Sequence, residues 1–275
     1  MTALLWLNGA LLPANEARID PADRGLLLGD GLFETMRVAT GCVPLLERHL
    51  DRLGAGCATL FLPPPDRERL RRAVGDLLAA SGLVEGSMRL TVTRGCGPRG
   101  LRPPAQVQPT VMLTCAAGVS AMPAPVRLGV SRYVRDGSSP LSRVKSLNYL
   151  PMVMARMEAA AGGHDDALLL DGKGNVAEAS AANILLMLAG RVVTPPVEDG
   201  ALPGTSRARL LETGLCVEQS VPLACMREAQ AAWLVSALSL QPVASVEAYG
   251  HMYELEQCVE QEAVLREALF GNVVS

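Results

Sequence analysis

The sequence predicts a mixed α/β (α+β) protein that is divided into two domains. The chain has 275 residues, and a compact domain contains roughly 150 residues. Helical patterns alternate with strand patterns in the first 115 residues, whereas strand patterns dominate the second half. A stretch of small residues and prolines separates the halves, which is typical of a linker. We therefore expect a smaller N-terminal domain at residues 1–116, an interdomain linker at 117–125 and a larger C-terminal domain at 126–275.

The expected elements of the N-terminal domain follow from its apolar spacing. Residues 3–12 form an apolar stretch broken by Asn and Gly, which predicts a strand, a turn and a second strand. Apolar residues recur at helical spacing in 45–60 and again in 66–82, where an Asp precedes the pattern and a Gly follows it. Residues 88–93 and 110–115 are expected to be strands.

The C-terminal domain is expected to contain more strands than helices. A strand at 126–131 and a loop at 135–142 precede a helix expected from about Ser146 to Ala161, with Pro151 tolerated near its first turn. Two hairpins follow, the first around the turn at 171–175 and the second formed by 183–188 and 191–194. A short helical segment at 208–213 is opened by Gly204-Thr205-Ser206-Arg207.

Composition excludes several classes of function. The net charge is −3 and aromatic residues make up 3% of the chain, so we expect no nucleic-acid partner and no binding to an anionic membrane. The seven cysteines contain no C-x-x-C pair, and the three histidines are scattered, so we expect reduced thiols and no metal site. The chain shows neither a signal-peptide pattern nor an apolar run long enough to span a membrane, which favours a soluble cytoplasmic protein.

One dinucleotide-binding motif is excluded by its context. Residues 95–100 spell G-x-G-x-x-G after a predicted strand. A dinucleotide site needs a helix to begin at the third glycine and an acidic residue about 20 positions later. Here Pro103-Pro104 follows, and no acid stands at the required distance. We instead expect either a plain surface turn or a mobile loop that presents Arg99, together with Arg94, to an anionic substrate group.

Only two lysines are available for lysine chemistry, Lys145 and Lys173. Lys173 lies in an Asp-Gly-Lys-Gly-Asn turn, where its ammonium group would be hydrated and a poor nucleophile. Lys145 lies at the junction of a loop and a predicted helix, among residues that could desolvate it and lower its pKa. A lone lysine is more often structural than catalytic, so Lys145 becomes a candidate only as part of a group of functional residues.

Such a group exists for pyridoxal phosphate, which needs a Schiff-base lysine, a carboxylate for the pyridine nitrogen and an anion cradle for the phosphate. Glu178 is an acid in an otherwise apolar strand, where it requires a cationic partner. Thr205 and Ser206 open a helix, whose N–H groups and dipole attract a phosphate, although they would equally suit an ordinary N-cap. Arg52 shares a helix face with His49 and is either a phosphate ligand or a surface arginine.

The sequence resembles the fold-type IV pyridoxal phosphate enzymes, also called class IV aminotransferases, from about Trp6 to Val246. The resemblance rests on six motifs in order: Arg24-Gly25 with Gly29-Asp30-Gly31-Leu32-Phe33-Glu34; His49-Leu50-Asp51-Arg52-Leu53; Thr93-Arg94-Gly95; Lys145-Ser146-Leu147-Asn148-Tyr149-Leu150; Asp165-Asp166-Ala167-Leu168-Leu169-Leu170; and Glu178-Ala179-Ser180-Ala181-Ala182-Asn183. The resemblance implies the two-domain fold-type IV architecture, with the cofactor in the C-terminal domain, and a homodimer whose active sites lie at the subunit interface.

The resemblance also implies roles for individual residues. Lys145 would bind pyridoxal 5'-phosphate covalently and move protons, and Glu178 would pair with the pyridine nitrogen. The phosphate would be held by Arg52, by Thr205 and Ser206, and by a second segment at residues 236–239. Within that segment, Ala237 and Leu238 would contact the cofactor. The substrate would be contacted by Phe33, Arg94 and Arg99.

Three functions are compatible with the resemblance. The sequence is most similar to 4-amino-4-deoxychorismate lyases, which form pyruvate and 4-aminobenzoate in folate biosynthesis. This similarity rests on the loop at 93–100, Lys145-Ser146-Leu147-Asn148, and Ser236-Ala237-Leu238 with Gln241-Pro242-Val243. The first alternative is an aminotransferase that acts on branched-chain or D-amino acids. The second alternative is a non-catalytic binding protein on the same fold, against which the presence of Lys145 with Glu178 argues.

Overall fold

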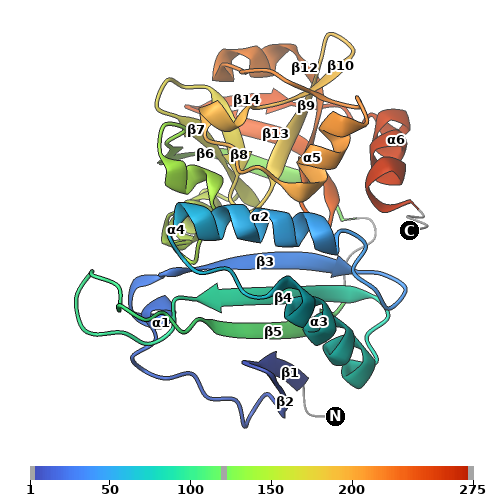
Figure 1. Cartoon of the computed structure of the whole chain (residues 1–275). Helices are drawn as coiled ribbons and strands as arrows, with labels where there is room; N and C mark the ends of the chain where they lie inside the picture. Colours follow the sequence, from blue (N-terminus) through green and yellow to red (C-terminus); the bar gives the residue numbers. More distant parts are fainter. Residues whose placement is uncertain (1–3, 119–122, 272–275) are drawn as a thin grey trace. The chain divides into compact units, whose positions relative to one another are not determined.

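The computed structural model describes residues 4–118 and 123–271, which divide into two compact units (Figure 1). Unit 1 comprises residues 4–118 and Val144–Asn148. Unit 2 comprises residues 123–143 and 149–271. None of the helices in these ranges has the length and apolar character that crossing a membrane would require.

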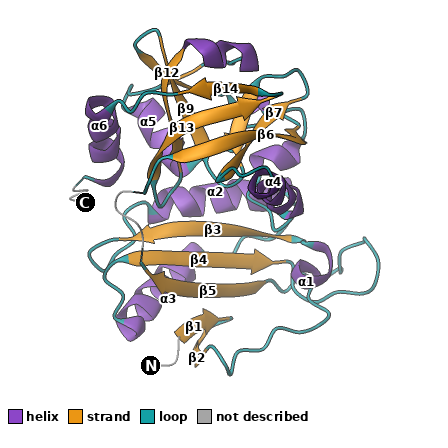
Figure 2. Ribbon diagram, turned by 180° about the vertical axis from the view of Figure 1, so that it is seen from behind, coloured by secondary structure: helices purple, strands orange, loops and turns teal. Residues whose placement is uncertain are grey.

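Unit 1 is an antiparallel five-stranded sheet in the order β2-β1-β5-β4-β3. Its strands are β1 (Leu4–Leu7), β2 (Ala10–Pro13), β3 (Gly31–Val38), β4 (Gly86–Thr93) and β5 (Thr110–Ala117), and its helices are α1 (Arg24–Leu28), α2 (Leu46–Thr59) and α3 (Arg67–Ser81). Helix α2 packs on β3, and α3 packs on β1 and β5 (Figure 2). The core between them includes Leu53, Leu77, Met88 and Leu90.

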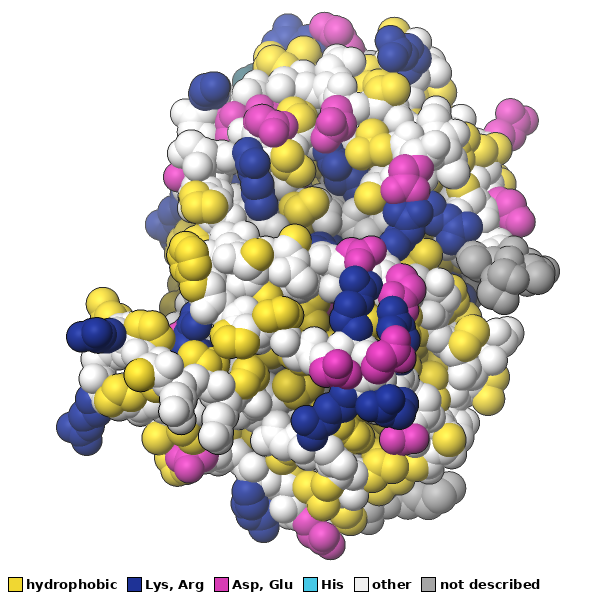
Figure 3. Space-filling model, viewed as in Figure 1, with side chains coloured by type: hydrophobic (Ala, Val, Ile, Leu, Met, Phe, Trp, Pro, Cys, Tyr) yellow, Lys and Arg dark blue, Asp and Glu magenta, His cyan; other side chains and the backbone are white. Residues whose placement is uncertain are grey.

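The predicted helices of unit 1 are confirmed, including the residues that bound the second one. The carboxylate of Asp66 accepts a hydrogen bond from the Arg69 N–H at 2.7 Å and caps the N-terminus of α3. Gly82 ends α3 in the left-handed conformation, with φ of 64°. Ion pairs such as Arg71 with Glu47 join α3 to α2, and Figure 3 shows acidic and basic side chains interspersed on the face that it views. This face therefore carries no broad surface of one charge that would attract a polyanion.

Unit 2 is built on a nine-stranded mixed sheet in the order β11-β10-β9-β12-β13-β6-β7-β8, with β14 paired to β13. Its strands are β6 (Val126–Arg135), β7 (Asp166–Asp171), β8 (Val176–Ala179), β9 (Asn183–Leu188), β10 (Arg191–Thr194), β11 (Val217–Glu218), β12 (Ala229–Val235), β13 (Leu240–Ala248) and β14 (His251–Glu254). Its helices are α4 (Leu150–Ala161), α5 (Thr205–Glu212) and α6 (Val259–Phe270), with short 3₁₀ turns at Pro140–Arg143, Val197–Asp199 and Leu223–Glu228. Both predicted hairpins, β7 with β8 and β9 with β10, are confirmed.

The helix expected from about Ser146 begins later, at Leu150. Residues 145–147 instead lie along the edge of β3, where the Phe33 N–H donates to the Lys145 carbonyl at 3.0 Å and the Leu147 N–H donates to the Gly31 carbonyl at 2.9 Å. These bonds group Val144–Asn148 with unit 1 rather than with the rest of the expected C-terminal domain. The predicted linker at 117–125 includes residues 119–122, which lie outside the described residues, so the linker stays a prediction.

Candidate active site

Lys145 is positioned by the edge of β3. The backbone bonds of residues 145–147 to β3 fix the lysine beside Phe33, and Lys145 Nζ lies 4.4 Å from the centre of the Phe33 ring. The side chain is half-buried, whereas Lys173 is exposed in its turn. The aromatic face replaces part of the water around the Lys145 ammonium group. Of the two lysines, Lys145 is therefore the one that is partly shielded from water.

Arg52 belongs to a buried cluster that also contains Glu34 and His49. Arg52 donates to both carboxylate oxygens of Glu34, with Nε–Oε1 2.8 Å and Nη2–Oε2 2.5 Å, and His49 Nδ1 lies 2.6 Å from Glu34 Oε2. Burial alone would raise the pKa of the Glu34 carboxyl, but hydrogen bonds from His49 and Arg52 and their charges outweigh burial and lower this pKa. Glu34 is therefore ionised at neutral pH and fixes the direction of the Arg52 guanidinium group.

Glu34 was missed by the sequence reasoning, although a signal for it exists. It is an acid within the buried strand β3, which is the same anomaly that singled out Glu178 in β8. An acid at such a position requires a cationic or hydrogen-bonding partner. The same test applied to β3 would have found the cluster.

Glu178 has the cationic partner that its position requires, and the partner is Arg135 at the end of β6. Arg135 Nε lies 2.9 Å from Glu178 Oε1, and the Leu202 N–H donates to Glu178 Oε2 at 2.9 Å. The Asn183 amide nitrogen lies 3.5 Å from the same oxygen and donates to the Leu202 carbonyl at 2.9 Å. Glu178 is thus a buried carboxylate held on both oxygens. Such a carboxylate can accept a hydrogen bond from a protonated nitrogen of a ligand.

The N-terminus of α5 is the segment that the sequence predicts to bind an anion. Its N-cap residue is Gly204, which has no side chain to cap the first N–H groups of the helix. A Cβ at this position would lie 2.0 Å from Asn183 Oδ1, so only glycine fits. Ser206 Oγ donates to the Ser236 carbonyl at 2.8 Å, which joins the helix to residues 236–239. Among the described residues, the N-cap of α5 makes no side-chain hydrogen bond, and helix N–H groups in this situation can bind an anion such as a phosphate group.

The turn at 236–239 is held by its own serine. Ser236 Oγ accepts hydrogen bonds from the backbone N–H groups of Leu238 at 3.1 Å and Ser239 at 3.2 Å. Ala237, which lies between Ser236 and Leu238 in the chain, is half-buried. Because Ser206 contacts this turn, the two predicted phosphate-binding segments adjoin each other within unit 2.

The two arginines expected to bind substrate differ in their surroundings. Arg94 is buried, and its guanidinium group donates to Asp30 at 2.8 Å and to the carbonyls of Leu60 and Phe61 at 2.8 and 3.0 Å. These contacts lie within unit 1 and hold the guanidinium group in place, and a contact of Arg94 with the substrate stays a prediction. Arg99 is exposed on the loop that follows and is the arginine open to a ligand.

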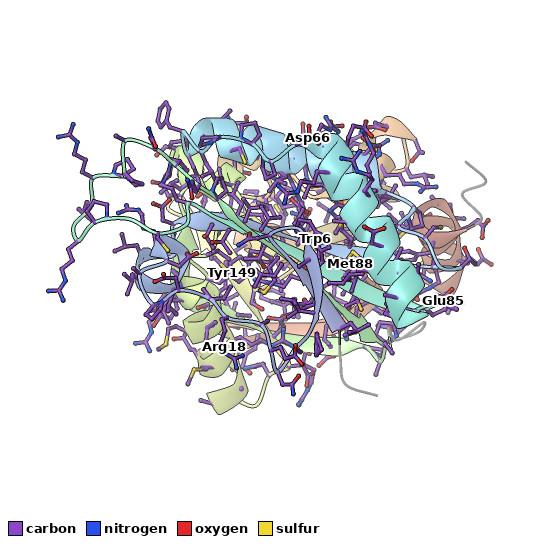
Figure 4. The ribbon with its side chains drawn as sticks, turned by 60° about the horizontal axis from the view of Figure 1, so that its bottom comes forward. Trp6, Arg18, Asp66, Glu85, Met88 and Tyr149 are labelled. Atoms are coloured by element: carbon purple, nitrogen blue, oxygen red, sulfur yellow. The ribbon has the colours of Figure 1, made fainter. Side chains whose placement is uncertain are left out.

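A separate cavity of about 720 Å³ opens in unit 1. Trp6, Arg18 and Asp66, which are among its lining residues, are labelled in Figure 4. Its lining includes none of the residues predicted for the cofactor or the substrate. The candidate active site is therefore defined by its side chains and not by this cavity.

The chain is similar in sequence and in structure to several known proteins. A family model described as amino-transferase class IV matches residues 31–246. The "Putative branched-chain-amino-acid aminotransferase" of Methanocaldococcus jannaschii is 36% identical over 74% of this chain and 72% of that protein. The bifunctional aminodeoxychorismate lyase / D-amino acid transaminase of Mycobacterium tuberculosis is 29% identical over 86% of this chain and 88% of its own length. The crystal structure of 4-amino-4-deoxychorismate lyase from Pseudomonas aeruginosa aligns with a TM-score of 0.82 at 33% identity, covering 98% of this chain and 100% of that one.

Proposed function

Because this chain belongs to the class IV aminotransferase family, whose members are pyridoxal 5'-phosphate-dependent enzymes, we propose that it is a 4-amino-4-deoxychorismate lyase. The observation that carries the proposal is the likeness to the lyase from Pseudomonas aeruginosa, which extends over the whole length of that protein. The bifunctional relative from Mycobacterium tuberculosis, whose name includes the same lyase activity, gives further support.

The residues of unit 2 fit the two polar ends of the cofactor. Glu178, held by Arg135 and the Leu202 N–H, is the carboxylate that we expect to pair with the pyridine nitrogen. The uncapped N–H groups of α5, at Thr205 and Ser206, are those that we expect to bind the phosphate. When bound, pyridoxal 5'-phosphate supplies an electron sink that stabilises negative charge at the substrate carbon.

Further contacts with the phosphate are proposed for residues 236–239 and for Arg52. In the turn, Ala237 and Leu238 would contribute through their backbone. Arg52 would contribute through its guanidinium group, which Glu34 keeps in one orientation.

Lys145 is the residue that we expect to carry the chemistry. Its Nζ would bind the cofactor covalently until the substrate amine replaces it, and would then remove the proton from the ring carbon that bears this amine. The ether C–O bond would then break, the departing enolate would take up a proton and become pyruvate, and the ring would become aromatic 4-aminobenzoate. Phe33 would pack against the substrate beside Lys145 Nζ. Arg99 would bind a substrate carboxylate.

A second candidate is an aminotransferase that acts on branched-chain or D-amino acids. The identity with the Methanocaldococcus jannaschii protein favours it. In that reaction Lys145 would return its proton to a cofactor carbon, and the product would be a keto acid. The cofactor-binding residues named above serve either reaction, so the two candidates differ in how the substrate is held.

The test is to give the cofactor-loaded enzyme 4-amino-4-deoxychorismate and to measure pyruvate and 4-aminobenzoate. Equal amounts of the two products are expected, with turnover lost by more than about 10³-fold in Lys145→Ala, because general acid–base catalysis alone contributes 10²–10⁴. Lys173→Ala is the matched control and should keep full activity. Turnover of only D-alanine or a branched-chain amino acid would establish the second candidate, and full activity in Lys145→Ala would refute both.

We also propose that the enzyme is a homodimer. Helix α4 exposes apolar side chains at helical spacing, with Leu150 68%, Val153 49% and Met157 61% exposed. A contiguous exposed apolar stripe of this kind is typical of a protein interface. The proposed partner is a second copy of the chain.

A further inference from the structure

The glycine-rich loop, residues 95–102, is fastened to unit 1 by the side chain of Arg24. Arg24 Nη1 donates to the carbonyl of Gly100 at 3.0 Å, and Nη2 donates to the carbonyl of Leu101 at 3.0 Å. Nη1 also lies 3.5 Å from the carbonyl of Arg102. Arg24 itself is 4% exposed. A buried guanidinium group thus contacts three consecutive carbonyls of a loop in which residues 98–102 are exposed.

Asp30 fixes the direction in which Arg24 points. Arg24 Nε donates to Asp30 Oδ2 at 2.9 Å, which leaves Nη1 and Nη2 directed at the loop. The same oxygen accepts from Arg94 Nε at 2.8 Å. Burial raises the pKa of the Asp30 carboxyl, but the hydrogen bonds from Arg94 and Arg24 outweigh burial and keep this pKa below its ordinary value. Asp30 therefore stays charged and keeps the Arg24 guanidinium group in place.

Gly97 allows the loop to pack closely against the aliphatic part of the Arg24 side chain. A Cβ at Gly97 would lie 2.9 Å from Arg24 Cδ and 3.2 Å from Pro104 Cδ. Because the Arg24 side chain is held at both ends of its guanidinium group, it cannot move aside without losing these bonds. The Arg24 N–H also donates to the Gly95 carbonyl at 2.9 Å, so backbone and side chain together hold the loop.

We propose that Arg24 is a positioning residue for substrate binding, which holds the glycine-rich loop so that Arg99 is presented to a carboxylate of the substrate. The inference rests on the proposed function, in which Arg99 binds this carboxylate. Arg24 does not touch the substrate and acts only through the loop. Without Arg24 the loop occupies its binding-competent conformation for a smaller fraction of the time, and the apparent affinity for substrate falls by that fraction.

The first test measures the loop directly, without reference to activity. Trypsin is added to the cofactor-loaded enzyme, and cleavage of the Arg99–Gly100 bond is followed by mass spectrometry. Arg24→Gln should be cut at least about tenfold faster than the unmodified enzyme, since two or three charge-assisted hydrogen bonds no longer oppose local opening. Arg24→Lys keeps the charge beside Asp30 but cannot span the carbonyls, so it should be cut faster as well. Gly97→Ala should reproduce the effect from the loop side.

Arg18→Gln is the matched control for this test. The Arg18 guanidinium group also donates to backbone carbonyls, those of Asn15 and Ala17, both at 2.8 Å. These carbonyls lie outside the glycine-rich loop, so cleavage after Arg99 should be unchanged. Thermal melting of each variant shows whether it is folded under the conditions of the assay.

The second test uses a double-mutant cycle. Arg24→Gln should raise KM for the substrate about tenfold while kcat stays within about twofold, which is the signature of lost uniform binding. Because Arg24 acts through Arg99, the double variant Arg24→Gln/Arg99→Ala should have the KM of Arg99→Ala alone. Additive effects on KM, or unchanged cleavage in Arg24→Gln, would overturn the inference. Faster cleavage in Arg24→Gln together with an unchanged KM in Arg99→Ala would instead refute the role of Arg99 in the proposed function.

Discussion

Glu34 shows how one buried carboxylate organises its surroundings. It accepts two hydrogen bonds from Arg52 and lies within hydrogen-bond distance of His49, and its side chain is 2% exposed. Replacing it by glutamine removes the ion pair between Glu34 and Arg52. Breaking such a buried pair costs about 3–5 kcal/mol of stability. Glu47 also accepts from arginines, but it is exposed, and its pairs contribute about 0–1 kcal/mol.

The stability of the enzyme is predicted to fall in acid, and Glu34 is predicted to cause part of this fall. In the unfolded chain a glutamate has a pKa of about 4.3, and the fold lowers the pKa of Glu34 below its ordinary value. The unfolded state therefore takes up the proton at a higher pH than the folded state. The stabilisation is complete above about pH 4.3 and is lost as the pH falls towards the folded pKa.

Urea unfolding at pH 7 and pH 3 measures this effect. The free energy of unfolding should drop less between the two pH values in Glu34→Gln than in the unmodified enzyme, whereas Glu47→Gln should lose much less stability than Glu34→Gln at pH 7. An equal drop in the unmodified enzyme and Glu34→Gln would contradict the assignment of the pH dependence to this carboxyl.

At the scale of elements, Asn183 of β9 links the N-terminus of α5 to Leu202, whose N–H donates to Glu178. Asn183 donates to the Leu202 carbonyl, and its Oδ1 fills the space in which a Cβ at Gly204 would lie. The buried side-chain amide of Asn183 thus contacts both ends of the proposed cofactor site, the one at Glu178 and the one at the N-terminus of α5. A change at Gly204 is therefore expected to disturb both ends.

Gly204→Ala is predicted to weaken the binding of pyridoxal 5'-phosphate. The new Cβ would displace Asn183, and the dissociation constant should rise at least about tenfold, equivalent to about 1.4 kcal/mol. Absorbance titration of the cofactor-free protein measures the constant. Gly172→Ala is the control, since a Cβ there meets open space at an ordinary φ. Equal affinity in the two variants would show that Gly204 is not part of the cradle.

The elements also show where sequence reasoning succeeds and where it fails. Asp66 and Gly82 were identified as the ends of a helix because capping depends on neighbouring residues. The start of α4 was misplaced because residues 145–147 pair with β3, and no local pattern records a distant strand edge. The requirement of Glu178 for a cation was visible in the sequence, but its partner Arg135 was not, because only the sheet brings β6 beside the hairpin that contains Glu178.

At the scale of the whole molecule, the proposed homodimer gives a direct prediction. Sedimentation should yield twice the chain mass of 29.0 kDa. Met157→Glu places a charge in the exposed apolar stripe of α4 and should raise the dimer dissociation constant at least about tenfold. Met252→Glu alters an exposed methionine of β14, which is outside the stripe, and should leave the dimer intact. Dissociation by both variants or by neither would contradict an interface at α4.

Because residues 144–148 belong to unit 1, the sheet of unit 1 can be completed during synthesis only after these residues have been made. When the ribosome has produced β5, all five strands of the first sheet exist, but the free edge of β3 has no cover along Gly31–Phe33 until residues 145–147 emerge. An open strand edge invites pairing with another nascent chain. The peptide that closes this edge is the same peptide that carries Lys145. Placement of the lysine that we propose as the reactive amine and covering of this strand edge are therefore a single event in the synthesis of the chain.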